Sequence, residues 1–270
     1  MMKRILALIE VSVVFSLMIV LFRIVHGFPL SIEINASLNG YLFSEYTALL
    51  IIGLILYTFR FRNRLDIPLK EKLNYQAKII GRGFFPIFLL SVLLSWVPWG
   101  EWGGSILISA IQVGLLVWFA WLVKDQKPTW QRQSMSSGLL LFPILMQISE
   151  KVGSILIAIV YFYLFVAVSE EILFRGYIQT RLNSVFGSSR QFFSIPWGWG
   201  VIFPAIFFGF WHLGLGTNSL NWPHVIWTTF AGLIFGIARQ KSGSVIAPSF
   251  LHGIMNYGPQ AILFYLFWQQ

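Results

Sequence analysis

Long apolar runs alternate with short polar connections along most of the chain. A membrane-spanning helix needs about 17–25 apolar residues, and the first run, Ile5 to Val25, has that length. It ends without a small-residue cleavage site, so we expect a retained helix and not a signal peptide. The further runs are Tyr46–Phe59, Phe84–Val97, Ser105–Val123, Val152–Val168, Trp199–Leu213, Val225–Ala238 and Val245–Trp268. The pattern predicts an all-α, polytopic transmembrane helical bundle of about eight spans.

A shorter run, Gly138–Ile148, leaves the number of spans open. It is either an interfacial or re-entrant piece or a ninth span. Strict alternation of the basic and non-basic connections requires this run to cross, which would place the C-terminus outside the cell.

The composition favours the same class of protein. Of the 270 residues, 57% are hydrophobic and 11% are charged, whereas an ordinary soluble domain carries about 25% charged residues. The 12 Trp and 26 Phe fit aromatic belts and lipid-facing rings. The chain has no cysteine, which excludes disulfides, thiolate metal sites and a cysteine nucleophile.

The positions of lysine and arginine predict the orientation of the helices. Lys3 and Arg4 precede the first run, which indicates a cytoplasmic N-terminus. The connection 27–44 contains no Lys or Arg, whereas the connection 60–82 is rich in both. The net charge of +9 therefore belongs to cytoplasmic connections, and we expect no nucleic-acid partner.

Two adjacent carboxylates, Glu170 and Glu171, follow the run that ends at Val168. Neighbours on a helix point about 100° apart, so we expect that the two cannot face one site. Arg175 follows Glu171 at the spacing of a same-face ion pair, and it would hold Glu171 ionised and anchor the helix end. Glu170 would then face the bundle interior as a candidate general base. The alternative, equally weighted on these residues alone, is a charged helix end at the membrane interface.

Three further polar residues lie in apolar surroundings. His212 follows an aromatic run, where a single histidine is more often a hydrogen-bonded core residue than a catalyst. His252 and Asn256 are four residues apart and share one face of the last helix, where they are either catalytic or polar contacts between helices. Glu10 lies within the first run and has no evident partner.

Together these groups are the kinds that peptide hydrolysis by an activated water needs. Glu170 and His212 could bind and deprotonate a water, and His252 and Asn256 could donate hydrogen bonds to an oxyanion. The chain has no Gly-x-Ser-x-Gly elbow and no His-Glu-x-x-His helix, which weakens serine-type and common zinc mechanisms.

The same residues form three recognisable motifs. EEILFR fits Glu-Glu-x-x-x-Arg, FGFWH (Phe208–His212) fits Phe-x-x-x-His, and HGIMN (His252–Asn256) fits His-x-x-x-Asn/Asp. In this order on successive hydrophobic helices they resemble the motifs of the CPBP family. That family comprises the CAAX prenyl endopeptidases of the Ras-converting type and bacterial relatives, including bacteriocin-processing and self-immunity proteins. The resemblance covers about Ser136 to the C-terminus.

The resemblance implies an α-helical intramembrane glutamic protease of a bacterial or archaeal cytoplasmic membrane. Glu170 and His212 would activate the water, His252 and Asn256 would form the oxyanion hole, and Glu171 and Arg175 would support them. Residues 136–270 would be the catalytic core, and residues 1–135 would be N-terminal helices that carry none of the motifs. The substrate would be a membrane-associated protein or peptide, including a prenylated one, and no cofactor is expected.

Three alternatives stay open. One is a non-proteolytic membrane scaffold or immunity protein of the same fold. Another is a proton-coupled transporter, which predicts internal repeats that the sequence does not show. The third is a metal-dependent hydrolase with zinc on Glu170, His212 and His252, because carboxylate and imidazole suit zinc.

The expected topology conflicts with a joint site. It places Glu170 and His252 near the cytoplasmic side and His212 near the opposite end of its helix. A joint site therefore requires a different helix register, for which Pro196, Pro204 and Gly198 provide a plausible break.

Overall fold

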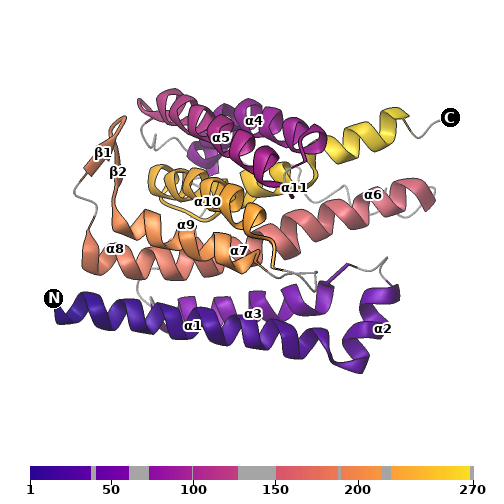
Figure 1. Cartoon of the computed structure of the whole chain (residues 1–270), viewed down its shortest axis with the longest axis horizontal. Coiled ribbons are helices and arrows are strands. Elements are labelled where there is room, and N and C mark those ends of the chain that lie inside the picture. Colours follow the sequence, from indigo (N-terminus) through magenta and orange to yellow (C-terminus); the bar gives the residue numbers. More distant parts are fainter. Residues whose placement is uncertain are drawn as a thin grey trace.

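The computed structural model describes residues 1–37, 41–60, 73–98, 100–126, 150–187, 190–213 and 220–267. In these ranges the chain is helical apart from one small hairpin and short connections (Figure 1). The N-terminal helices are α1 (Met2–His26), α2 (Pro29–Ser37), α3 (Phe43–Arg60), α4 (Leu73–Trp96) and α5 (Trp102–Val123). The remaining helices and strands are α6 (Glu150–Val160), η3 (Tyr161–Ala167), α7 (Val168–Glu171), η4 (Ile172–Gln179), α8 (Thr180–Phe186), β1 (Arg190–Phe192), β2 (Ile195–Trp197), α9 (Trp199–Trp211), α10 (Trp222–Ser242) and α11 (Ile246–Phe267).

Several helices in the described ranges are suited to a membrane. Four segments are long and apolar enough to cross one, namely Met2–His26, Leu73–Leu94, Trp102–Val123 and Ile155–Phe186. Phe43–Phe59 and Trp199–Trp211 are shorter apolar helices. An all-α integral membrane bundle is therefore confirmed, whereas the expected count of eight or nine spans is not. The run Gly138–Ile148 lies outside the described residues.

Helix α1 shows how such a helix divides its surface. Its buried residues Ala7, Val11, Phe15, Met18 and Phe22 recur every three or four positions and face the bundle. Large apolar side chains such as Ile9, Leu17 and Ile24 stay exposed on the other face. A helix that is apolar all round belongs in a core or a membrane, so we assign the exposed face of α1 to lipid.

The segment that carries the two carboxylates is longer than its apolar run predicts. The run ends at Val168, but the helix continues without a break through η3, α7, η4 and α8 to Phe186. The prediction of a span ending near Val168 is therefore wrong. The polar residues beyond it, including Arg175 and Gln179, are 0% and 1% exposed, because other helices cover them. The winding is π-helical on both sides of α7, a local form that is frequent at functional sites.

A β-hairpin with a two-residue turn reverses the chain direction after α8. Strands β1 and β2 pair antiparallel, with Arg190 opposite Trp197 and Phe192 opposite Ile195. Phe193 and Ser194 at the turn have φ values of 46° and 62°, the positive values that a tight hairpin turn with the correct twist requires. Helix α9 then starts at Trp199 and packs against α8 and η4.

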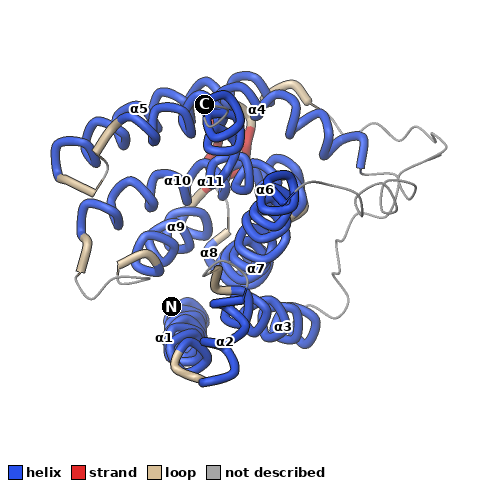
Figure 2. The backbone as a smooth tube through the Cα atoms, turned by 90° about the vertical axis from the view of Figure 1, so that its right-hand side faces the viewer, coloured by secondary structure: helices blue, strands red, loops and turns tan. Residues whose placement is uncertain are grey.

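The helices of the C-terminal half lie between two groups of N-terminal helices (Figure 2). On one side α4 packs against α11, and α5 packs against α10. On the other side α3 packs against α7 and η4, and α1 packs against α3 and α8. The predicted boundary between residues 1–135 and 136–270 stays a prediction, but helices of the first range cover both faces of the second.

Candidate functional site

A cavity of about 310 Å³ is lined by residues from both halves of the chain. Glu170 of α7, His212 just after α9, and His252 and Asn256 of α11 all line it. The other lining residues are Tyr46, Ser91, Leu94, Tyr161, Phe162, Val166, His224, Trp227 and Met255. The structure thus places at one cavity the four residues that the sequence predicts to be catalytic.

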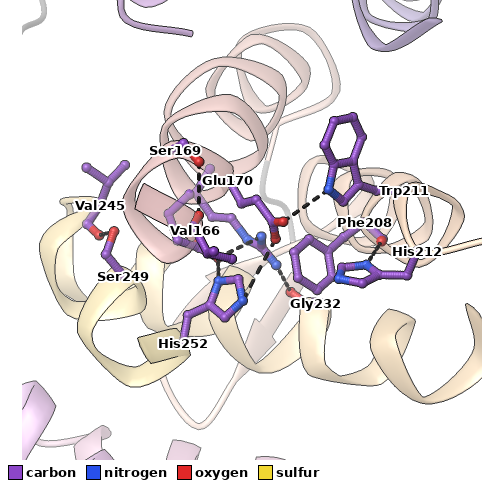
Figure 3. A network of polar contacts seen from close by, with 12 residues as sticks. Val166, Ser169, Glu170, Phe208, Trp211, His212, Gly232, Val245, Ser249 and His252 are labelled. Carbon is purple, nitrogen blue, oxygen red and sulfur yellow. Dashed lines mark hydrogen bonds and ion pairs between the residues drawn. The ribbon is translucent and has the colours of Figure 1, made fainter. Parts of the chain in front are cut away.

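Glu170 is completely buried, and its two carboxylate oxygens have different surroundings. Oε1 accepts hydrogen bonds from the Tyr46 hydroxyl at 3.1 Å and from Nε1 of Trp211 at 3.0 Å. Figure 3 shows the contact with Trp211. Oε2 accepts no hydrogen bond from the described residues, and Nε2 of His252 lies 3.8 Å from it. One oxygen is therefore held by two donors, whereas the other has no hydrogen bond from the described residues.

Glu171 and Arg175 form the ion pair that their spacing predicts. Nη1 of Arg175 donates to Oε1 of Glu171 at 2.9 Å, and both side chains are 0% exposed. Nη2 of Arg175 donates to the carbonyl of Gly232 at 2.9 Å, and the guanidinium lies 4.6 Å from the ring centre of Phe208. The prediction that Arg175 anchors a helix end is wrong, because the helix continues past it. Arg175 instead joins η4 to α10.

His252 contacts both carboxylates. Its Nδ1 lies 3.0 Å from Oε1 of Glu171, and its Nε2 lies 3.8 Å from Oε2 of Glu170. As the sequence predicts, Glu170 lines the cavity and Glu171 does not, yet His252 reaches both carboxylates. A single imidazole has nitrogens on two sides of its ring, so it can meet two carboxylates that leave a helix in different directions.

The neighbours of His252 determine which of its ring nitrogens carries the proton. Oε1 of Glu171 is the acceptor of the Arg175 ion pair, so Nδ1 of His252 donates to it. A neutral His252 then has a lone pair on Nε2, and only an imidazolium donates from both nitrogens. Its ring is stacked on Phe235 with the centres 4.7 Å apart, which fixes the ring plane between the two helices.

His212 has a defined tautomer. Its Nδ1 lies 2.8 Å from the carbonyl oxygen of Phe208. A carbonyl only accepts, so Nδ1 carries the proton, and Nε2 of the neutral ring is left as an acceptor. The His224 ring lies 5.2 Å away, centre to centre, and it also lines the cavity.

The expected conflict in depth between Glu170 and His212 is removed by the long helix. The stretch of helix from Glu170 to the end of α8 at Phe186 is similar in length to the stretch from the start of α9 at Trp199 to His212. At the helical rise, both residues lie roughly 20–25 Å from the hairpin end of their helices. The two residues therefore reach a similar depth along antiparallel helices.

Asn256 is partly exposed and lies one turn beyond His252. Helix α11 is fixed near this point because Oγ of Ser91 in α4 contacts the carbonyls of Ile254 and Met255, each at 3.1 Å. A Cβ on Gly253 would overlap the Tyr163 ring, so only glycine allows α11 to approach η3 this closely.

Several residues of this region carry no signal in the sequence. Tyr46 stands in an N-terminal apolar run and belongs to none of the three motifs. Trp211 is adjacent to a motif histidine, but its position alone does not indicate a hydrogen bond to Glu170. Glu10 does have partners, since its oxygens accept from Tyr177 at 3.0 Å and from Arg181 at 2.8 Å.

The zinc alternative gains no support from the geometry. Within the described ranges, no group of three or more His, Asp or Glu side chains is arranged to hold a metal ion.

Comparison with known proteins returned one family. Residues 152–258 match the sequence model of the Rce1-like family, described as type II CAAX prenyl endopeptidases. Neither a curated protein nor a solved structure matched the chain. The match begins in α6 and ends in α11, and it contains all three motifs and the four cavity residues. It confirms the resemblance drawn from those motifs: residues 152–258 are similar to the Rce1-like family of type II CAAX prenyl endopeptidases.

Proposed function

We propose that this protein is an intramembrane glutamate-type endopeptidase. It hydrolyses a peptide bond near the C-terminus of a membrane-associated or lipidated protein, in a bacterial or archaeal cytoplasmic membrane. The observation that carries the proposal is the asymmetry of Glu170. Tyr46 and Trp211 hold one oxygen, and the other is left at the cavity that His212, His252 and Asn256 also line.

Two acceptors are available for the attacking water. Oε2 of Glu170 is one, and Nε2 of His212 is the other because Nδ1 carries its proton. A water that donates a hydrogen bond to each has an oxygen lone pair left for the scissile carbonyl carbon. As the new C–O bond forms, one water proton passes to one of these two acceptors, and the carbonyl oxygen becomes an oxyanion.

His252 and Asn256 are the donors for that oxyanion. The carboxamide N–H of Asn256 donates directly, and Nε2 of His252 donates in its imidazolium form. Glu171 stabilises this imidazolium through Nδ1, while Arg175 balances the charge of Glu171. When the intermediate collapses, the C–N bond breaks and the proton taken from the water passes to the leaving nitrogen. The products are a new C-terminus and a short released peptide.

The proposal is tested with purified protein in liposomes. The probes are fluorogenic peptides that end in a farnesylated cysteine followed by three residues, together with the same peptides without the farnesyl group. We expect Glu170→Gln, His212→Ala and His252→Ala each to abolish cleavage and to leave the amount of membrane-inserted protein unchanged. The matched control is Glu101→Gln, which alters an exposed carboxylate. Full activity in any one of the three variants would rule out the assigned mechanism.

A chelator treatment separates the glutamate mechanism from the zinc alternative. We expect activity to persist after treatment with a strong chelator, because water activation is assigned to Glu170 and His212. Loss of activity that added zinc restores would instead support the metal-dependent hydrolase. If the wild type binds the peptides and cleaves none of them, the scaffold alternative is favoured.

A further inference from the structure

The N-terminal helix α3 reaches the proposed catalytic carboxylate. Tyr46 lies in the first turns of α3 and is 8% exposed. Its hydroxyl donates to Oε1 of Glu170 at 3.1 Å, across a sequence separation of 124 residues. Nε1 of Trp211 donates to the same oxygen at 3.0 Å from α9. Two donors on different helices therefore converge on one carboxylate oxygen.

Two donors fix the carboxylate plane where one does not. The terminal torsion of a glutamate side chain is broad, so a carboxylate with one hydrogen bond can still rotate about it. With Oε1 held from both α3 and α9, Oε2 is confined to the side that faces His252 and the cavity. Removal of the Tyr46 hydroxyl would leave Trp211 as the remaining donor to Oε1 among the described residues.

Tyr46 is itself held in place by the first helices of the chain. Its ring makes edge-on contacts with Phe22, at 5.3 Å between ring centres, and with Tyr161, at 5.8 Å. The preceding residue, Glu45, is 0% exposed and accepts from Nδ2 of Asn35 at 3.0 Å and 2.9 Å. Nδ1 of His26 also lies 2.8 Å from Glu45. The start of α3 is thus tied to α1 and α2.

We propose that Tyr46 is a positioning residue for Glu170, and that α3 is part of the catalytic apparatus. This inference rests on the proposed role of Glu170. It extends the site beyond the segment 152–258 that matches the family, because that segment supplies only one of the two donors to Oε1. Tyr46 does not touch the reacting atoms, and it acts by orienting the carboxylate that does.

A kinetic comparison tests the role of Tyr46. In the liposome assay with the farnesylated peptide, we expect Tyr46→Phe to lower kcat by about 10- to 100-fold and to leave KM within about twofold, because misalignment affects the chemical step. The matched control is Tyr75→Phe, which removes another buried hydroxyl, one that donates to the carbonyl of Lys241 at 2.9 Å away from the cavity. An unchanged kcat in Tyr46→Phe, or equal losses in the two variants, overturns the proposal.

A labelling experiment tests the contact without any substrate. A hydrophobic carbodiimide reacts with buried carboxyl groups, and peptide mass spectrometry separates modification of Glu170 from that of Glu171. We expect Tyr46→Phe to be labelled several-fold faster than wild type at Glu170, because Oε1 has lost a donor, and at the same rate at Glu171. Equal rates at Glu170 overturn the proposal. If the wild type cleaves no probe, the proposed function fails, and this comparison alone decides whether Tyr46 holds the carboxylate.

Discussion

His252 is the residue at which the three motifs meet. Its two nitrogens face Glu171 and Glu170, and its ring lies 5.5 Å from that of Phe208 in the motif that ends at His212. With Arg175 paired to Glu171, an imidazolium at His252 would balance the charge of Glu170. Four ionisable side chains can thus be buried with no net charge, which lowers the cost of placing them in a membrane.

A single substitution can test the proposed role of Asn256. As a carboxamide donor to the oxyanion it would act mainly in the transition state. We expect Asn256→Ala to lower kcat by about 10²–10³-fold, the usual cost of losing one such donor, with little change in KM. Steady-state kinetics on the farnesylated peptide measure both constants. A higher KM with an unchanged kcat would assign Asn256 to substrate binding instead.

The Glu171–Arg175 pair predicts a strong effect on stability. Both side chains are fully buried, so removal of one leaves an uncompensated charge. We expect Arg175→Met to lower the free energy of unfolding by about 3–5 kcal/mol. The double variant Glu171→Gln, Arg175→Met should recover a large part of that loss because it removes both charges. Unfolding by denaturant in detergent gives the three values, and a double variant less stable than Arg175→Met would contradict the pairing.

At the scale of single helices, the sequence predicts apolar runs well and helix ends poorly. The run 152–168 is found as a helix, but that helix ends at Phe186 and not at Val168. Arg175 and Gln179 are polar, so a hydropathy pattern places them in a connection after the apolar run. Their side chains are nevertheless buried, and they donate hydrogen bonds to the carbonyls of Gly232 and Gly236 in α10. Both contacts join residues that are far apart in the sequence, so they are not visible in a local pattern.

The approach of α9 to α10 depends on Gly209. A Cβ at this position would overlap Oγ1 of Thr229 and would lie 2.7 Å from the carbonyl oxygen of Val225. The second contact is with backbone, so it cannot be relieved by a side-chain rotation. His212 follows three residues later, and its position therefore depends on this packing.

We expect Gly209→Ala to lower the thermal unfolding temperature and, by displacing His212, to reduce kcat by about tenfold or more. The control is Gly114→Ala in α5, where an added Cβ meets nothing within 4 Å, and which should be neutral or slightly stabilising. Thermal unfolding in detergent and the peptide assay measure the two effects. Equal behaviour of the two variants would mean that the α9–α10 contact adapts without cost.

At the scale of the whole molecule, the three motifs locate the cavity but not its surroundings. Glu170, His212, His252 and Asn256 are predictable because their types and spacing are unusual on apolar helices. Tyr46 is not, since one tyrosine among apolar residues has no distinguishing pattern. The helices before residue 127 therefore contribute to the surroundings of the site, and only the packing shows this. They cover both faces of the C-terminal helices (Figure 2).

Basic residues of several described segments lie at one end of the bundle. Arg4 donates to the carbonyl of Val185 at 3.3 Å, which places the N-terminus beside the end of α8. Asn183 in α8 donates to Gln240 at 3.1 Å, and Lys241 donates to the carbonyl of Lys124 at 2.6 Å. The ends of α5, α8 and α10 and the start of α1 therefore lie together. Glu101 lies at the other end, because Ser105 in the first turn of α5 donates to Pro223 at the start of α10.

This arrangement predicts the orientation of the protein in its membrane. Basic connections stay in the cytoplasm, so we expect the end with Lys3 and Arg190 to be cytoplasmic and Glu101 to be external. The chain has no cysteine, so single-cysteine variants give labels that report one position each. In intact cells a membrane-impermeant maleimide should label Glu101→Cys and leave Lys3→Cys and Arg190→Cys unlabelled until the cells are permeabilised; all three side chains are exposed. Labelling of Lys3→Cys and Arg190→Cys in intact cells would show that the basic end is external. The orientation of this protein would then not follow the distribution of its lysines and arginines.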